Sequence, residues 1–380
     1  MAVGNQAEKP RFFIDLLNYN YHIGNVEVAH TNWQTDPLVV SPHAFDFSPV
    51  NPYLINTSSG PAYFKVALKT PISVPSNAKM FVAILGHEFN FKNLYWRLNL
   101  GTSQQGFSGD NSDYEHEDQD FESIVNGHTN DHYNQCDYNG WSLSTFTPSL
   151  NENIMTFHFI TQNVNITSNP IYSNVGSIAI GYVYEPEFHA DLSVTQRRIM
   201  DGVKQKQTKG GSTYSVINHI KPPNWWNSTP FELYTDSSFK HRSSRLGRRS
   251  WDVRFSQLQD RFYTDGVPNG VFPANELVGT HEADLLNGGY TDGEDVTVTE
   301  NADGTTPATG DFNYNINNDN SLYSTVYHNT LGGTLPFLFS PSQDNSPGNF
   351  AICRFDKPGF QVQQKTYKKF NVNMRINETW

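Results

Sequence analysis

The chain has 380 residues, with 26 Lys plus Arg against 38 Asp plus Glu, a formal net charge of −12, and 14% aromatic but only 17% charged residues. An average globular domain carries roughly 25% charged residues, whereas disordered chains are rich in charge and poor in aromatics. The low charge and high aromatic content of this chain therefore exclude a disordered chain. The length allows one large β domain or two medium domains, each with a sizeable core. Because the 27 Gly, 21 Pro and 40 Asn residues favour turns over long helices, we expect an all-β fold.

The first half of the chain contains short runs of β-forming residues, each bounded by Gly, Asn, Pro or Ser. These runs cover residues 79–85, 94–98, 141–147, 154–160 and 177–184. Several of them alternate apolar with polar side chains, which is typical of a sheet with one buried face. The pattern predicts a jelly-roll-like β-sandwich over residues 13–186, preceded by an N-terminal arm over residues 1–12.

A second set of β-type runs begins after Pro186 and predicts a C-terminal β domain over residues 187–380. The runs cover residues 250–256, 351–356, 359–364 and 367–376, and the last two are expected to form a hairpin across Lys365 and Thr366. The strand alternation indicates that Trp251, Phe255 and Phe355 are core residues.

The last strand and one helix complete this predicted domain. In the strand, alternation places Lys368, Phe370, Val372, Met374 and Ile376 on the face toward the core, beside Phe355 or Phe360. One short helix is expected from about residue 319 to residue 330, with Leu322 and Val326 on one face. The pair Gly332 and Gly333 would end it.

The cysteine content and the hydropathy of the chain indicate the cellular compartment in which it folds. Cys136 and Cys353 stand far apart, with no CxxC or Cys/His grouping near either one, so no structural zinc or redox site is expected. A chain so poor in cysteine fits folding in a reducing compartment, and a single disulfide between Cys136 and Cys353 is the alternative. The first ten residues are polar and no run approaches 18 apolar residues, so we expect neither a signal peptide nor a membrane-spanning segment.

Charge is distributed in blocks along the chain. Between Arg97 and Arg197 there are 13 acidic residues and no Lys or Arg. Residues 197–261 hold 13 basic and 5 acidic residues, and from there to Arg354 there are 12 acids and no base. Such blocks fit a basic segment that lies against an acidic partner or a neighbouring copy. The alternative is that the blocks neutralise each other within one fold.

The run of residues 240–251, KHRSSRLGRRSW, is the most basic in the chain. Clustered arginines neutralise nucleic-acid phosphates, but they also hold carboxylates bidentately at protein interfaces. The net charge of −12 favours the protein interface, and we expect no nucleic-acid partner. Aromatic and Arg side chains anchor such interfaces. The candidate interface residues are Arg242, Arg245, Arg248, Arg249, Trp225, Trp226 and Trp380.

Two long segments, residues 101–140 and 266–310, are acidic and poor in apolar side chains, and we interpret them as surface loops. The first carries Asp110, Asp113, Glu115, Glu117, Asp118, Asp120 and Glu122. Their spacing lacks the glycine-pivoted order of an EF-hand loop, so a solvated loop is preferred and a structural cation remains the alternative.

Catalytic constellations are missing from the sequence. There is no Gly-x-Ser-x-Gly elbow, phosphate loop or His-Glu-x-x-His motif. His128 and His132 have helical spacing but stand in a context of Asn and Asp, which favours a surface pair over a zinc site. We therefore expect no enzymatic activity, no metal and no cofactor.

From Gly176 onward the order of short motifs resembles a group of virion structural proteins of tailed bacteriophages, including marine ones. The motifs are Gly176-Ser177-Ile178, Asp191-Leu192-Ser193-Val194-Thr195, Thr208-Lys209-Gly210-Gly211, Lys221-Pro222-Pro223-Asn224-Trp225, Gly247-Arg248-Arg249-Ser250-Trp251-Asp252, Gly332-Gly333-Thr334-Leu335-Pro336-Phe337, Phe350-Ala351-Ile352-Cys353-Arg354-Phe355-Asp356 and Trp380. The resemblance covers the C-terminal half well. It implies a structural role in the virion, in the tail or baseplate, after assembly in the host cytoplasm.

Two functions of different classes follow. The first is a non-enzymatic tail or baseplate component that docks other virion proteins or fibres and forms homo-oligomers in the particle. The alternative is a receptor-binding adhesin whose sandwich holds a host surface polysaccharide, with Trp33, Trp96 and Trp141 beside the acidic loop as sugar contacts. A depolymerase would in addition turn that glycan over, and we expect none. Neither function requires membrane insertion.

Overall fold

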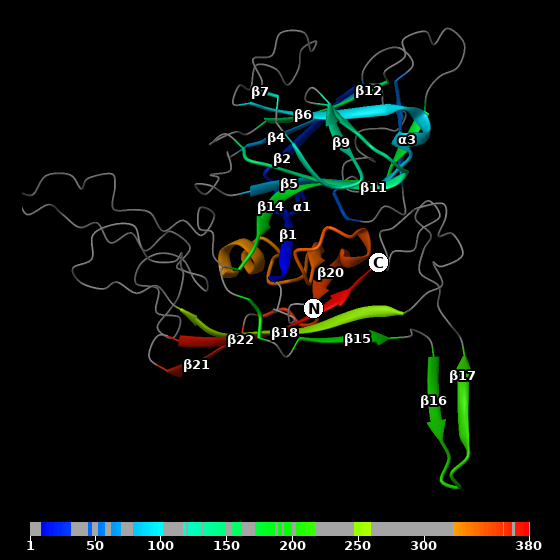
Figure 1. Ribbon diagram of the computed structural model, residues 1–380, viewed down its shortest axis with the longest axis vertical. Helices are drawn as coiled ribbons and strands as arrows, with labels where there is room; N and C mark the ends of the chain where they lie inside the picture. The colour runs from blue at the N-terminus through cyan, green and yellow to red at the C-terminus, as the bar shows by residue number, and fades with distance from the viewer. Residues whose placement is uncertain are drawn as a thin grey trace, which may run out of the picture.

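The computed structural model describes residues 9–31, 45–47, 52–57, 62–69, 79–101, 117–118, 121–130, 133–148, 154–161, 172–186, 189–191, 194–199, 203–217, 247–259, 322–359, 361–366 and 369–379. The described part consists mostly of antiparallel β-strands, so the predicted all-β class is confirmed (Figure 1). The helical elements are short: α1 (Leu16–His22), α3 (Phe89–Lys92), the π-helix η3 (Leu322–His328) and the 3-10 turn η4 (Pro347–Asn349).

Two sheets form the main body, and we call them the long sheet and the short sheet. The long sheet has 11 strands, with the order β15 (Thr195–Ile199), β18 (Arg248–Gln259), β22 (Lys369–Glu378), β20 (Ala351–Phe355), β19 (Phe337–Ser340), β1 (Arg11–Asp15), β14 (Ser177–Tyr184), β5 (Lys79–His87), β11 (Gly140–Phe146) and β8 (Glu122–Val125), while β21 (Val362–Thr366) pairs with β22.

The short sheet has 7 strands: β2 (Val26–Thr31), β4 (Ala62–Leu68), β12 (Ile154–Thr161), β6 (Leu94–Gly101), β10 (Tyr133–Gln135) and β9 (His128–Asn130), with β7 (Glu117–Asp118) paired to β6. Two further strand pairs are not hydrogen-bonded to either sheet. One joins β13 (Tyr172–Val175) to β3 (Tyr53–Asn56), and the other joins β16 (Val203–Gln207) to β17 (Thr213–Ile217).

The short sheet packs on one half of the long sheet as a β-sandwich, as predicted for the N-terminal region (Figure 1). The strand β5 shows how the sequence builds it. Val82 and Ile84 enter the core between the sheets, whereas Phe81, Ala83 and Leu85 enter a second core on the other face. A strand buried on both faces has a continuous apolar sequence, which explains the run KMFVAIL.

The strand β1 connects the two halves of the chain. Phe12 is opposite Tyr184 of β14 on one side and Phe339 of β19 on the other. Arg11 and Phe12, which lie in the range predicted as an N-terminal arm, therefore belong to a central strand of the long sheet. The predicted boundary near Pro186 falls directly after β14, and the hydrogen bonds of the long sheet continue across it through β1.

The C-terminal strands enclose a further core, to which Phe12, Ile14 and Tyr184 of β1 and β14 also contribute. Trp251, Phe255 and Phe355 are buried in it, as predicted. Val372, Met374 and Ile376 point into the same core and Ile376 is opposite Phe355, which confirms the predicted inward face of the last strand for these residues. Lys368 and Phe360 lie outside the described residues, as does the side chain of Phe370.

Two local predictions need correction. Lys365 and Thr366 are the last residues of β21, and Thr366 pairs with Lys369 of β22, so these two residues do not form the turn of this hairpin. The predicted helix is present but is the π-helix η3, which buries Leu322 and Val326 as expected. Gly332 and Gly333 both have positive φ after it, and a Cβ on Gly333 would lie 2.5 Å from the Phe355 ring. This close approach requires glycine.

Candidate functional site

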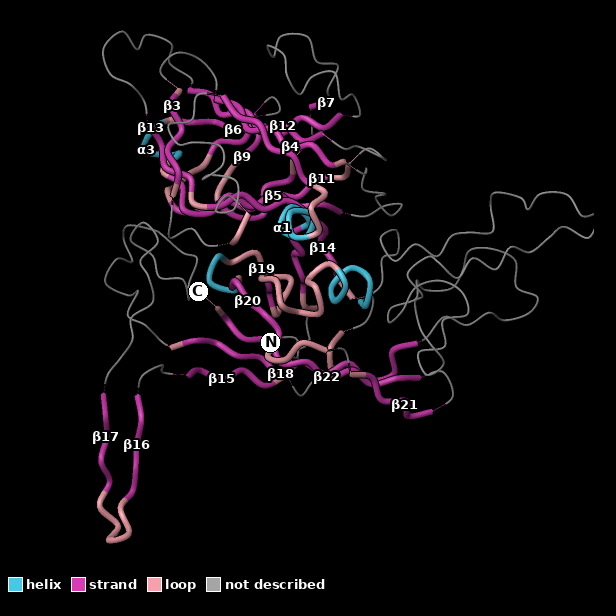
Figure 2. The backbone as a smooth tube through the Cα atoms, turned by 180° about the vertical axis from the view of Figure 1, so that it is seen from behind, coloured by secondary structure: helices cyan, strands magenta, loops and turns pink. Residues whose placement is uncertain are grey.

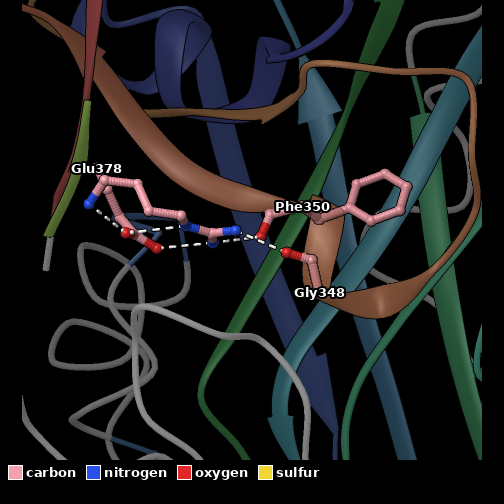
Figure 3. A network of polar contacts seen from close by, with 4 residues as sticks. Gly348, Phe350 and Glu378 are labelled. Atoms are coloured by element: carbon pink, nitrogen blue, oxygen red, sulfur yellow. Dashed lines mark hydrogen bonds and ion pairs between the residues drawn. The ribbon is translucent and has the colours of Figure 1, made fainter. Parts of the chain in front are cut away.

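The predicted interface residue Arg249 lies in the interior, in contact with Glu378 (Figure 3). Its Nη2 donates to Glu378 Oε1 at 2.8 Å, and its Nε and backbone N donate to Oε2 at 3.1 and 2.8 Å. Nη1 and Nη2 also donate to the carbonyl oxygens of Gly348 and Phe350. The Trp251 ring lies 5.3 Å from the guanidinium carbon. Arg249 therefore joins β18, β22 and the turn before β20.

Burial raises the pKa of the Glu378 carboxyl, while the adjacent Arg249 guanidinium opposes this shift. The carboxylate has three donors from one residue, so the two buried charges satisfy each other. The sequence carries a signal for this pair. Positions 372, 374 and 376 alternate into the core, and continuing the alternation places Glu378 on the same buried face.

The other predicted interface residues have different locations. Arg248 is half-buried in β18. Arg242, Arg245, Trp225, Trp226 and Trp380 lie outside the described residues.

The tryptophans proposed as sugar contacts are core residues of the sandwich. Trp96 and Trp141 are each 1% exposed, and Trp96 packs edge-on against Phe121. Trp33 lies outside the described residues. Because a glycan would stack on an exposed ring face, Trp96 and Trp141 do not serve as its platform in this fold.

The pair of β16 and β17, with its turn, forms a feature that we call the basic hairpin (residues 203–217). It extends away from the two sheets in both views of the chain (Figures 1 and 2). Every side chain from Val203 to Val216 is exposed, including Tyr214 at 65% and Val216 at 58%. The strand register places Lys204 opposite Val216 and Lys206 opposite Tyr214, so basic and apolar side chains share one face.

The turn of the basic hairpin is fixed by its own hydrogen bonds. Thr208 N donates to Ser212 O at 2.9 Å, and Gly211 N donates to Thr208 O at 3.0 Å. The Thr208 hydroxyl accepts from Ser212 N, and Gly211 has φ of +83°. The motif Thr208-Lys209-Gly210-Gly211 thus forms the turn of a hairpin, with Lys209 at its tip.

A cleft of about 520 Å³ opens in the C-terminal part of the long sheet. β18 and β22 form one wall through Asp252, Arg254 and Arg375, and the segment after β20 forms another through Asp356 and Lys357. A smaller pocket of about 230 Å³ adjoins it and is lined by Gln361, Gln363, Asn371 and Asn373. No sequence pattern predicted this cleft, because amide side chains in a strand are equally typical of a solvent-facing surface.

A buried histidine and cysteine form the nearest approach to a reactive pair. Cys136 Sγ lies 3.8 Å from His87 Nε2, and the His87 ring stacks on Phe89. Burial lowers the pKa of His87 to about 3 and raises the pKa of the Cys136 thiol to about 12. Both groups are therefore neutral at physiological pH, and the thiol lacks the thiolate character of a nucleophile. Cys136 and Cys353 are both free thiols.

Within the described ranges, no group of three or more His, Cys, Asp or Glu side chains is arranged to hold a metal ion. Of the acidic cluster, Glu117, Asp118 and Glu122 fall in described strands, and the other members lie outside them, as does His132. None of the helices described is long and apolar enough to cross a membrane.

No protein-family model and no curated protein matches the chain. Among solved structures, it is similar to a carbohydrate-binding module from Clostridium perfringens, in complex with glcNAc-alpha-1,4-galactose, at 11% identity and a TM-score of 0.26, over 48% of this chain and 100% of that one. A pectin-binding carbohydrate-binding module matches at 12% identity and a TM-score of 0.25, over 41% of this chain and 88% of that one. Similarity at this level carries no argument about ligand or function.

Proposed function

We propose that this protein is a non-enzymatic structural component of a tailed-phage virion, a tail or baseplate adaptor that docks copies of itself and other virion proteins. The basic hairpin is the observation that carries the proposal. It is a paired element with no described neighbour beyond its own two strands, and it holds apolar side chains in solvent.

An isolated two-stranded hairpin is at best marginally stable in water, because neither face is covered. Val203, Tyr214 and Val216 are 38%, 65% and 58% exposed on this hairpin. Aromatic and aliphatic side chains presented in this way are used at protein interfaces, where a partner removes them from water. The hairpin therefore has the character of a docking element.

The charge of the hairpin defines the chemistry of its partner. Lys204, Lys206 and Lys209 are the only charged residues between positions 203 and 217. The whole chain carries a net charge of −12, and the segment between Arg97 and Arg197 holds 13 acids without a base. Electrostatic complementarity favours an acidic protein surface, and a second copy of this chain supplies one.

The strand order of the sandwich also supports a virion role. Eight strands in chain order are β1, β4, β5, β6, β10, β11, β12 and β14. Numbered from one to eight, they follow the order one, eight, three, six in the long sheet and two, seven, four, five in the short sheet. We infer a jelly roll of two Greek keys, an architecture used by viral capsid proteins and by lectins. Since fold alone does not set function, the hairpin remains the main support.

The tail or baseplate position rests on the motif resemblance. Residues of several motifs lie together: Trp251 of β18, Phe337 of β19 and Ala351 of β20 share one core, and Arg249 of β18 donates to the carbonyl oxygen of Phe350 just before β20. These contacts give the motifs a common structural role, which is to hold together the C-terminal strands of the long sheet. Mapping the chain in an electron cryo-microscopy reconstruction of the particle would distinguish a tail position from one in the capsid shell.

The docking role is tested with a charge-reversed hairpin. Sedimentation velocity of the full chain at low salt should show self-association that is lost in Lys204→Glu/Lys206→Glu. The control Lys357→Glu/Lys365→Glu changes the net charge equally at exposed positions elsewhere and should associate like the wild type. Equal loss in both variants, or a monomeric wild type, would contradict the proposal. Binding of the wild type to DNA with a steep salt dependence would replace it with a nucleic-acid interface.

A further inference from the structure

The cleft in the C-terminal part of the long sheet arises from a gap in strand pairing. On one side, β22 pairs with β18 along most of its length. On the other side it pairs with β20 as far as Ile376 opposite Phe355, and then with β21 from Val372 opposite Val362. Residues 373–375 of β22 lie between these two partners. The chain leaves β20 and rejoins the sheet at β21, and the cleft occupies the space between.

The floor of the cleft is apolar and held in place. The rings of Tyr327 and Phe355 lie 5.2 Å apart at an interplanar angle of 31°, and the Phe337 ring lies 5.0 Å from Phe355 on the core side. The Tyr327 hydroxyl donates to the carbonyl oxygen of Gly359, which ties η3 to the segment after β20. Gly333 allows the backbone to approach the Phe355 ring. These contacts fix the shape of the floor and leave Tyr327 and Phe355 only 7% and 8% exposed.

Four of the charged groups that line the cleft, Asp252, Arg254, Asp356 and Arg375, already have polar partners, whereas none is described for Lys357. Asp252 accepts from Arg375 Nε at 2.5 Å and forms an ion pair with Arg197 at 2.8 Å. The hydrogen bond from Arg375 holds the pKa of Asp252 below its usual value. Arg254 is paired with Asp191 outside the cleft, and Asp356 accepts from Asn377. A charged ligand would have to compete with these pairs, so the rim favours a neutral one.

The adjoining pocket supplies the polar recognition groups. Gln363 is opposite Asn371 in the ladder between β21 and β22, and the strand alternation places Gln361 and Asn373 on the same face. An amide donates through its NH₂ and accepts through its oxygen. A sugar hydroxyl likewise donates and accepts, so a row of amides matches a chain of hydroxyls better than it matches an ion or an apolar group.

We propose that this cleft binds a neutral oligosaccharide, with its hydroxyls against the exposed amides of Gln361 and Asn373 and its apolar groups against the small accessible parts of Tyr327 and Phe355. The volume of about 520 Å³ falls within the range of small-molecule sites, about 300 to 1,000 Å³. The site lies in the C-terminal half of the chain, distinct from the sandwich and from the basic hairpin. The inference is therefore independent of the docking role.

The test uses the full chain and a panel of neutral tetrasaccharides, namely glucans, galactans and mannans, with binding read by isothermal titration calorimetry and by ligand-observed NMR. At least one should bind the wild type, and Gln361→Ala/Asn373→Ala should weaken that binding about tenfold or more with an unchanged melting temperature. The matched control Gln205→Ala/Gln207→Ala removes two exposed amides from the basic hairpin and should bind as the wild type does.

Three results would overturn the inference: no binding of any panel member, an equal loss in the control variant, or tighter binding of a charged oligosaccharide such as polygalacturonate. A second variant, Asn373→Asp, keeps the size of the side chain but adds a charge, and it should also weaken binding of the neutral ligand. Because the hairpin is unchanged in both cleft variants, they should self-associate like the wild type. A failure here is thus separable from a failure of the docking proposal.

Discussion

Two parts of the same basic segment, residues 197–261, use their charges in opposite ways. Arg249 in β18 is 4% exposed, and its guanidinium is fully engaged with Glu378 and two carbonyl oxygens. Lys204 and Lys206 in β16 are exposed, and among the described strands β16 pairs with β17 alone. The first charge joins β18, β22 and the turn before β20, whereas the others are exposed to solvent. Charge density along the sequence therefore does not by itself locate an interface.

The largest expected effect comes from removing the strand that receives Arg249. β22 pairs with β18, β20 and β21, so deleting residues 367–380 should expose three strand edges and open the C-terminal core. We expect insoluble or non-cooperatively melting protein by circular dichroism. The control deletion of residues 1–9 should leave a cooperative transition. A soluble, cooperative product of the C-terminal deletion would show that this strand is dispensable.

Substitution of Arg249 should have the next largest effect. Arg249→Ala leaves Glu378 buried without its partner, which should lower the free energy of unfolding by about 3 to 5 kcal/mol in urea denaturation. The control Arg254→Ala breaks a half-exposed pair with Asp191 and should cost no more than about 1 kcal/mol. Similar losses in both variants would remove the distinction between the buried and exposed arginines.

The sandwich contains a buried titratable group that should respond to acid. The pKa of His87 is lowered from 6.5 to about 3 by burial, so the unfolded state binds a proton first as the pH falls. The contribution of His87 to the free energy of unfolding is therefore present above pH 6.5 and is lost as the pH falls below it. Between pH 7 and pH 5 this loss amounts to about 2 kcal/mol. His87→Gln should reduce that pH dependence, while His22→Gln, at an exposed position, should not.

The smallest effect on stability is expected at the basic hairpin. Lys204→Glu/Lys206→Glu removes no described contact to the sheets, so the free energy of unfolding should change by less than about 0.5 kcal/mol. Thermal melts of dilute protein at high salt, where association is suppressed, give the comparison. A loss comparable to that of Arg249→Ala would mean that the hairpin packs on the body of its own chain.

The residue pattern predicted the β class, the β-type runs and the inward face of the last strand, because alternation and burial are local consequences of side-chain type. It did not predict that β1 lies at the centre of the long sheet, since the pairing of Phe12 with Phe339 joins residues more than 300 positions apart. The arginine run predicted an interface, but Arg249 is buried in the fold because it pairs with Glu378, which is distant in sequence. The cleft depends on where β20 and β21 meet β22, and no local pattern encodes that gap.

Hydrogen–deuterium exchange tests the contrast between the two regions most directly. Amides of β18 should be protected at every protein concentration, because β15 and β22 flank this strand. Amides of residues 203–217 should exchange rapidly in dilute protein and become protected only at concentrations at which the chain self-associates. Protection of the hairpin in the monomer, or continued rapid exchange in the assembled protein, would contradict the assignment of the basic hairpin as a docking element.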